Sequence, residues 1–66
     1  MIRFTKTVDG KEVFNGIEKD KSVIRDCFHF CIPSIKKRVN DFLDGNSKQI
    51  TLHFGNETVV LKREIA

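Results

Sequence analysis

Two turn signals near opposite ends of the chain set strong limits on how it can fold. Asp9-Gly10 and Gly55-Asn56 each separate two stretches in which apolar and polar residues alternate. Alternation with a period of two is typical of strands with one buried face, and such two-residue turns are typical of β-hairpins. The sequence therefore predicts one hairpin over residues 1–17 and another over residues 48–65.

The register of the first hairpin decides which of its side chains are buried. A tight turn gives one apolar face that carries Ile2, Phe4, Val8, Val13 and Ile17. In that register Phe14 lies on the opposite face, beside Thr5. One extra residue in the second strand, a β-bulge, would reverse this placement, because a shift by one residue exchanges the two faces of a strand.

Between the hairpins the apolar residues recur with a helical period. The stripe consists of Ile24, Phe28, Cys31, Ile35, Val39 and Phe42. It keeps its phase across Pro33, which favours one helix over residues 22–44 that is kinked at the proline. The alternative is two short helices, with Pro33 at the first position of the second. We expect Asp20 or Ser22 to cap the N-terminus and Gly45 to cap the C-terminus.

These elements predict an α+β fold with two layers. Two hairpins and a helix, each with one apolar face, bury those faces most economically as a ββαββ unit. In this arrangement a four-stranded antiparallel sheet carries the helix on one face. The 66 residues form a single domain (1–66), whose small core supplies only ~3–5 kcal/mol. A homodimer is one way to support so small a core, and we keep it as an expectation.

No segment resembles a membrane span or a secretion signal. The apolar runs are far shorter than the ~18 residues of a spanning helix, and the first residues, MIRFTKTVDG, lack an apolar signal core. We expect a cytoplasmic protein with reduced thiols and no membrane contact. The net charge of +3 is modest and is spread along the chain, so charge alone does not indicate a strong polyanion binder.

Cys27, His29 and Cys31 form the stretch that most suggests chemistry. On a helix the two cysteines lie on the core stripe while His29 points away, so the three cannot converge on one ion. Side chains at positions i and i+4 have Cβ atoms ~5–6 Å apart, against ~3.5–4.5 Å in a disulfide. We therefore expect two buried thiols that behave as small apolar side chains, no metal site and no cofactor.

The sequence contains no catalytic motif. The nucleophile elbow, the phosphate-binding loop and the zinc-binding H-E-x-x-H pattern are all missing from it. A two-layer domain of this size also offers little room for a ligand pocket of ~300 Å³. We assign no catalytic residues and expect a protein that is not an enzyme.

The face of the sheet opposite the helix is the most informative surface in this prediction. It is mostly polar and carries Arg3, Thr5, Thr7, Glu12, Phe14, Gln49, Thr51, His53, Thr58, Val60, Lys62 and Glu64. Two of its members, Phe14 and Val60, are apolar. Such a face suits contact with a partner, stacking of nucleic-acid bases, or plain solvation.

The leading hypothesis is a small inhibitor or accessory regulator, of a type common in bacteriophages, that docks on a protein. Phe30 lies outside the helical stripe, where it is either turned into the core margin by the kink or exposed as an interface anchor. The residues assigned to the protein contact are Phe14, Phe30 and Val60, ringed by Lys37, Lys62 and Arg63.

The alternative hypothesis is an RNA or single-stranded nucleic-acid binder. Phe14 and His53 would stack on bases, and the cations would be Arg3, Lys36, Lys37, Lys48, Lys62 and Arg63. The basic run Lys36–Arg38 splays around a helix and is followed by Asp41 and Asp44. A solvated helix face therefore accounts for this run without any ligand.

Overall fold

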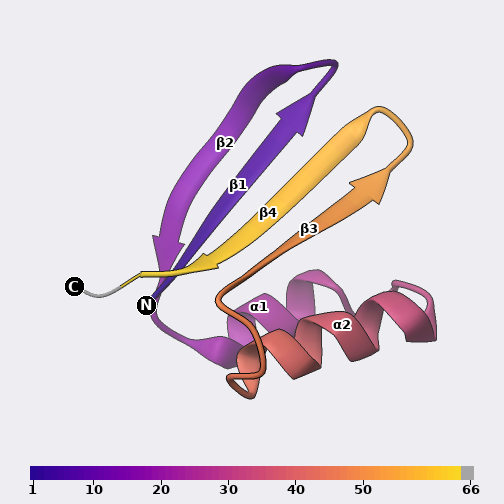
Figure 1. The fold of residues 1–66 in the computed structure, drawn as a ribbon. Helices are drawn as coiled ribbons and strands as arrows, with labels where there is room; N and C mark the ends of the chain where they lie inside the picture. The colour runs from indigo at the N-terminus through magenta and orange to yellow at the C-terminus, as the bar shows by residue number, and fades with distance from the viewer. Residues whose placement is uncertain (65–66) are drawn as a thin grey trace.

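The computed structural model describes residues 1–64 and has the element order β-β-α-α-β-β (Figure 1). The elements are β1 Ile2–Val8, β2 Lys11–Glu18, α1 Lys21–Cys27, α2 Pro33–Leu43, β3 Gln49–Phe54 and β4 Glu57–Arg63. The strands form one antiparallel sheet in the order β2-β1-β4-β3, so β2 and β3 are its edges. This confirms the predicted α+β fold with a four-stranded antiparallel sheet.

The single kinked helix over residues 22–44 is wrong, and the alternative with two helices is what the structure has. Ile32 is extended, with φ −64° and ψ 155°, and Pro33 opens α2. The ring of a proline disfavours a helical conformation in the preceding residue, while its missing N–H costs nothing at the first helical position. Within residues 1–64, neither helix has the length and apolar character that a membrane-spanning helix needs.

The helix ends follow the predicted capping. Asp20 accepts a hydrogen bond from the amide of Ser22 at 2.9 Å and caps α1. At the end of α2, Gly45 has φ +95°, and its amide donates to the carbonyl of Phe42. Asn46 donates to the carbonyl of Asp41, which completes the usual glycine-terminated helix end.

The first hairpin contains the bulge that reverses the face of Phe14. The turn is as predicted, because Asp9 and Gly10 both have positive φ. Val8 pairs with Lys11, but Lys6 pairs with Phe14, so Val13 is the extra residue of β2. The tight register is therefore wrong beyond the turn: Phe14 lies on the helix side of the sheet and Ile17 on the open side.

The core lies between the helices and the central strands. Its buried members are Ile2, Ile24, Phe28, Val39, Phe42, Leu43, Leu52, Val59 and Leu61. Four residues of the predicted helical stripe are among them, even though the helix is broken. The remaining two, Cys31 and Ile35, are partly buried and pack against the core.

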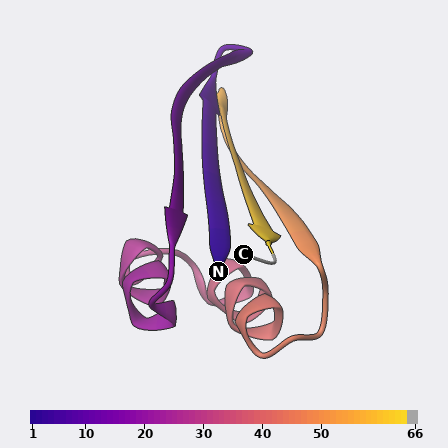
Figure 2. The same cartoon turned by 90° about the vertical axis from the view of Figure 1, so that its left-hand side faces the viewer.

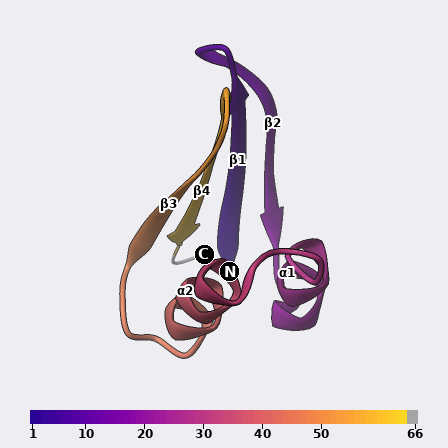
Figure 3. The same ribbon diagram turned by 90° about the vertical axis from the view of Figure 1, so that its right-hand side faces the viewer.

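The helices lie at the end of the sheet where the chain termini are, and the two hairpin turns project away from them (Figures 2 and 3). The part of the sheet near the termini is therefore well covered, while the part near the turns is less so.

Replacing Pro33 with alanine separates the two helical arrangements energetically. In the observed structure Pro33→Ala should lower the free energy of unfolding by about 0.4–1 kcal/mol, because the unfolded chain gains freedom and no helical bond is restored. A proline inside one continuous helix would instead cost about 3 kcal/mol, so its removal would stabilise the protein. Urea denaturation of both proteins measures the difference, and a clear gain in stability would contradict the observed helix start.

Candidate binding groove

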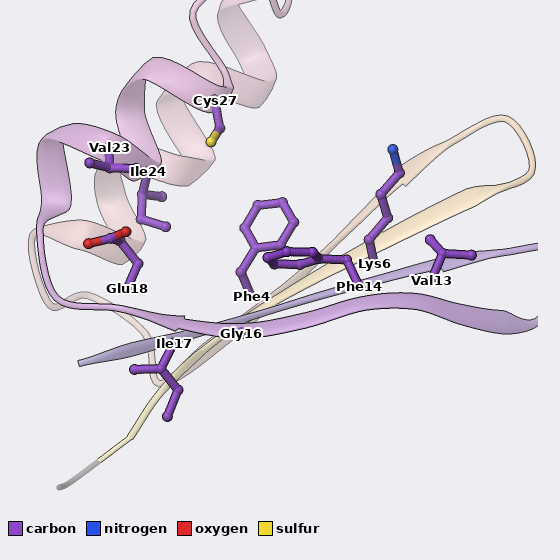
Figure 4. Close-up of a pocket in the computed structure, with 10 residues that line it drawn as sticks. All are labelled: Phe4, Lys6, Val13, Phe14, Gly16, Ile17, Glu18, Val23, Ile24 and Cys27. Carbon is purple, nitrogen blue, oxygen red and sulfur yellow. The ribbon is translucent and has the colours of Figure 1, made fainter.

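A hollow of about 510 Å³ lies between α1 and the strands β1 and β2 (Figure 4). Phe4, Phe14 and Val13 line it from the sheet, and Val23 and Cys27 line it from α1. We call this hollow the groove. It is larger than a domain of this size was expected to contain, because the hairpin turns extend beyond the helices.

Phe14 is the most prominent side chain of the groove. Its ring meets the ring of Phe4 edge to face, with 5.7 Å between centroids, yet 54% of the residue remains exposed. It also lies over Gly16, where a Cβ atom would come within 3.1–3.2 Å of the Phe14 ring. The missing side chain at Gly16 therefore allows Phe14 to lie along its own strand, which leaves one side of the ring open to the groove.

Phe14 is the first of four phenylalanines in a row across the molecule. Phe4 is followed by Phe28 at 6.2 Å and Phe28 by Phe54 at 6.5 Å between ring centroids. A second hollow, of about 220 Å³, lies along this row and shares Phe4 and Cys27 with the groove. The aromatic row thus gives the groove an apolar floor that continues toward β3. Phe14 was not expected in this row, because its place on the helix side depends on the bulge in β2.

The charged groups beside the groove already have partners. Lys6 Nζ lies 3.5 Å from Glu57 Oε1 on β4. Glu18 Oε1 accepts hydrogen bonds from the amides of Lys19 and Asp20, both at 2.9 Å. The surfaces left free in the groove are therefore apolar, and they suit an apolar occupant better than a charged substrate.

The prediction that both cysteines are buried is wrong for Cys27. Cys27 is exposed, and its sulfur points from α1 toward the rings of Phe4 and Phe14 (Figure 4). Cys31 is half-buried, and both thiols are free. In the part of the chain that the structure describes, no three side chains of His, Cys, Asp or Glu gather as a metal site would require.

The residues assigned to protein contact do not form one surface. Phe14 is in the groove, whereas Val60 pairs with Thr5 and lies on the open face of the sheet. Lys62 is exposed on that same open face. Phe14 and Val60 were expected on a common face, and this is wrong because of the bulge.

The other three members of that set lie in different places. Phe30 is in the connection between α1 and α2 and is 97% exposed, so it is not turned into the core margin. Lys37 is exposed on α2. Arg63 is half-buried: its guanidinium lies 5.0 Å from the centre of the Phe42 ring and donates to the carbonyl of Phe42. Arg63 therefore holds β4 against α2.

The residues assigned to nucleic-acid contact are also divided between surfaces. His53 lies on the open face, opposite Thr58, so it cannot form one stacking surface with Phe14. Lys36 and Lys48 are exposed, on α2 and just before β3. These positions place the predicted stacking rings and cations on at least two faces of the sheet.

Arg3 is occupied by partners within the chain. Its guanidinium donates to both carboxylate oxygens of Glu64 and to the side-chain oxygen of Asn15. The hydrogen bond between Arg3 and Glu64 raises the pKa of Arg3 and lowers the pKa of Glu64. The charge of Arg3 is therefore largely balanced on the open face.

Comparison with protein-family models, with curated proteins and with solved structures finds no match to this chain.

The Arg3–Glu64 pair predicts a pH dependence of stability. The lowered pKa of Glu64 means that its contribution is present above the ordinary value of 4.5 and is lost as the pH falls through the folded-state value. Glu64→Gln should therefore be less stable than the parent protein at pH 7, and the difference should shrink below pH 4.5. Thermal unfolding of both proteins from pH 7 to pH 2.5 tests this, and an unchanged difference at low pH would contradict it.

The two thiols should differ in their accessibility to a reagent. We expect an alkylating reagent to modify Cys27 several times faster than Cys31, because only Cys27 is exposed. Mass spectrometry of Cys31→Ser and Cys27→Ser, each with one remaining thiol, measures the two rates. Equal rates in the folded variants, with both rising in urea, would show that Cys27 is buried.

Proposed function

We propose that this protein is a non-catalytic module, of inhibitor or accessory type, that docks on another protein through the groove. The observation that carries the proposal is the half-exposed Phe14 ring, set beside a hollow of about 510 Å³ with apolar walls. Exposed aromatic surface at the edge of a hollow is costly in water, and it is typical of the anchors of protein interfaces.

The chemistry of the groove supports a protein partner more than a small molecule. Sites for small ligands combine apolar walls with a few convergent polar groups that orient the ligand. In the groove the charged side chains Lys6 and Glu18 are already engaged within the chain. A catalytic acid and base would likewise need free ionisable groups, and among the described residues that line the groove we find no such pair.

The placement of the cations supports a protein partner more than a nucleic acid. Binding of phosphates depends on several free cations on one surface. Here Arg3 is balanced by Glu64 and Arg63 is engaged with Phe42. Lys37 and Lys62 lie on α2 and on the open face of the sheet, away from Phe14.

Phe30 supports a second point of contact. It is 97% exposed, and its neighbours in the chain, Phe28 and Cys31, line the second hollow. His29 packs against it edge to face with 5.0 Å between centroids. We propose that Phe30 inserts into a pocket of the partner while Phe14 contacts the partner in the groove.

Substitution of Phe14 tests the proposal. Immobilised protein is used to capture partners from lysate with and without nuclease treatment. In the treated lysate Phe14→Ala should reduce capture of the bound protein by about 30-fold, the effect expected for an interface hot spot. The matched control is Val60→Ala, because Val60 is also apolar but lies on the open face of the sheet, opposite Thr5, and is not among the residues that line the groove. Circular dichroism checks that both variants fold.

Three outcomes would contradict the proposal. Equal loss in Phe14→Ala and Val60→Ala would move the contact away from the groove. Capture that disappears after nuclease treatment, or that weakens steeply between 50 mM and 200 mM salt, would favour the nucleic-acid hypothesis. Capture that is unchanged in Phe14→Ala would remove Phe14 from the interface.

A further inference from the structure

Exposed apolar side chains gather along the β2 edge of the sheet. Among the described residues, the exposed large hydrophobic side chains at this edge are Val13, Phe14 and Ile17 of β2 and Val23 of α1. α1 lies at the base of β2 (Figures 2 and 3), and the remaining exposed ones belong to the connection between the helices. Such a concentration of apolar surface is typical of a region that another chain covers.

The backbone of the β2 edge is open as well. Asp9 donates to the carbonyl of Asn56, so the odd-numbered residues of β1 bond to β4 and the even-numbered ones bond to β2. The β2 residues opposite the odd-numbered ones therefore have outward backbone groups, and these are Glu12, Asn15 and Ile17. In the described part of the chain, no backbone hydrogen bond from another element reaches these three residues.

The opposite edge, β3, is partly covered. The guanidinium of Arg38 from α2 donates to the carbonyl of Thr51 at 3.1 Å. This carbonyl points outward, because Arg63 donates to Lys48 and the even-numbered residues of β3 therefore face β4. Since an uncovered edge strand can pair with another chain, β2 is the edge that is available for pairing.

The bulge decides which side chains of β2 share a face. Residues that are paired across two strands have their side chains on the same side of the sheet. By their pairing with β1, the side chains on the helix side are those of Lys11, Phe14, Gly16 and Glu18. Those on the open side are Glu12, Asn15 and Ile17. A basic and an acidic residue thus lie on one face, at the two ends of the strand.

We propose that two copies of this chain pair their β2 strands in antiparallel fashion about a two-fold axis at Asn15. The four strands of each copy then form one continuous sheet. The two Asn15 residues bond to each other through their outward groups, and Ile17 bonds to Glu12 of the other copy on each side of the axis, while Val13 is skipped as it is in the pairing with β1. This register gives about six main-chain hydrogen bonds and uses the whole strand, Lys11–Glu18.

Charge favours a second copy as the occupant of this edge. In the register about Asn15, Lys11 lies directly opposite Glu18 of the other copy, and symmetry repeats this pair. Lys11 is exposed and makes no ion pair within the described residues. Glu18 uses Oε1 for its bonds to the amides of Lys19 and Asp20, so its second oxygen can accept a bond from Lys11. Opposite charges in directly opposed positions stabilise a strand pair.

Other two-fold registers use the strand less well. With the axis at Gly16, Phe14 lies opposite the charged Glu18, and Lys11 lies opposite Asp20, which is beyond the end of β2. With the axis at Phe14, Glu18 lies opposite Asp9 of the turn, and like charges in opposed positions destabilise a strand pair. The axis at Asn15 is therefore the one that matches both the charges and the length of the strand.

The same register covers exposed apolar surface. Phe14 lies opposite Gly16 of the other copy, and each ring lies along its own strand over its own Gly16. Neighbouring strands are about 4.8 Å apart, so the two Phe14 rings lie side by side across the axis. Because the strands are antiparallel, α1 of one copy lies beside the turn half of the other copy's hairpin, which brings Val23 toward Val13.

The two grooves join across the axis, and each gains Phe14 of the other copy. This last step rests on the proposed function, because it makes the docking surface a shared one. The pairing of the strands stands on the edge, the register and the charges alone.

Sedimentation and amide exchange of the unmodified protein test the pairing. We expect a dimer that dissociates on dilution. In the dimer the amides of Asn15 and Ile17 should exchange about tenfold or more slowly than in the monomer, because they become bonded. The amides of Gln49 and His53, which point outward from the β3 edge, are the matched control and should be unchanged.

Exchanged charges provide the second arm. Lys11→Glu and Glu18→Lys each place like charges opposite one another twice in the dimer, so each should raise its dissociation constant by about tenfold. An equal mixture of the two variants should recover the parent affinity, since every lysine then faces a glutamate. Lys48→Glu makes the same change of charge at an exposed position away from β2 and should have little effect.

Circular dichroism checks that the variants fold, and amide exchange stays informative if one of them does not. A protein that remains monomeric at about 1 mM would overturn the pairing. A dimer that neither charge variant weakens, or one that protects the β3 amides instead, would overturn this interface. A monomer whose Asn15 and Ile17 amides become protected only when a captured protein is bound would assign the edge to that protein.

The outcomes also separate this inference from the proposed function. A dimer that captures no protein from lysate would keep the strand pairing and remove the docking function. Phe14-dependent capture by a protein that is monomeric would keep the docking function and remove the pairing. Capture that Lys11→Glu weakens together with the dimer would show that docking requires the joined groove.

Discussion

The extra residue in β2 controls the arrangement of everything on that side of the sheet. Val13 has no pairing partner on β1. The residues after it are therefore shifted by one position relative to a tight hairpin. Phe14 then packs against Phe4 on the helix side, and Asn15 reaches Arg3 on the open side. One backbone irregularity thus provides the aromatic wall of the groove and a hydrogen-bond partner for the open face.

The groove also depends on how little of the sheet the helices cover. The core residues with no exposure, such as Phe42 and Leu52, belong to the part of the sheet that the helices cover. Both helices lie at the end of the sheet near the chain termini, and neither extends to the hairpin turns (Figures 2 and 3). The connection between the two helices leaves Phe30 exposed to solvent.

Three arginines stabilise the fold through different contacts. Arg63 lies on the Phe42 ring and bonds to its carbonyl, Arg3 pairs with Glu64, and Arg38 covers a carbonyl of the β3 edge. A planar group with several fixed donors suits each of these tasks. Two of the cations assigned to nucleic-acid contact, Arg3 and Arg63, are thereby engaged in holding elements of the fold together.

The sequence by itself determined the features that depend on neighbours in the chain. Turn residues with positive φ, the cap at Asp20, the glycine that ends α2 and the alternation of the strands all follow from local sterics and hydrogen bonding. The predicted apolar helical stripe was also correct, because the same residues face the core whether they belong to one helix or to two. The sequence also indicated a bulge in the first hairpin and a helix start at Pro33 as alternatives.

Only the tertiary structure decided between those alternatives. The register of β2 depends on which side chains bury more apolar surface by facing the core, either Phe14 or the pair Val13 and Ile17. It also depends on the hydrogen bond from Arg3 to Asn15. Both are contacts between residues that lie far apart in the sequence. The exposure of Cys27 and the open β2 edge likewise depend on where α1 packs. Periodicity places residues on a face, but it cannot say how far a neighbouring element extends over that face, and the groove exists because α1 extends only part of the way.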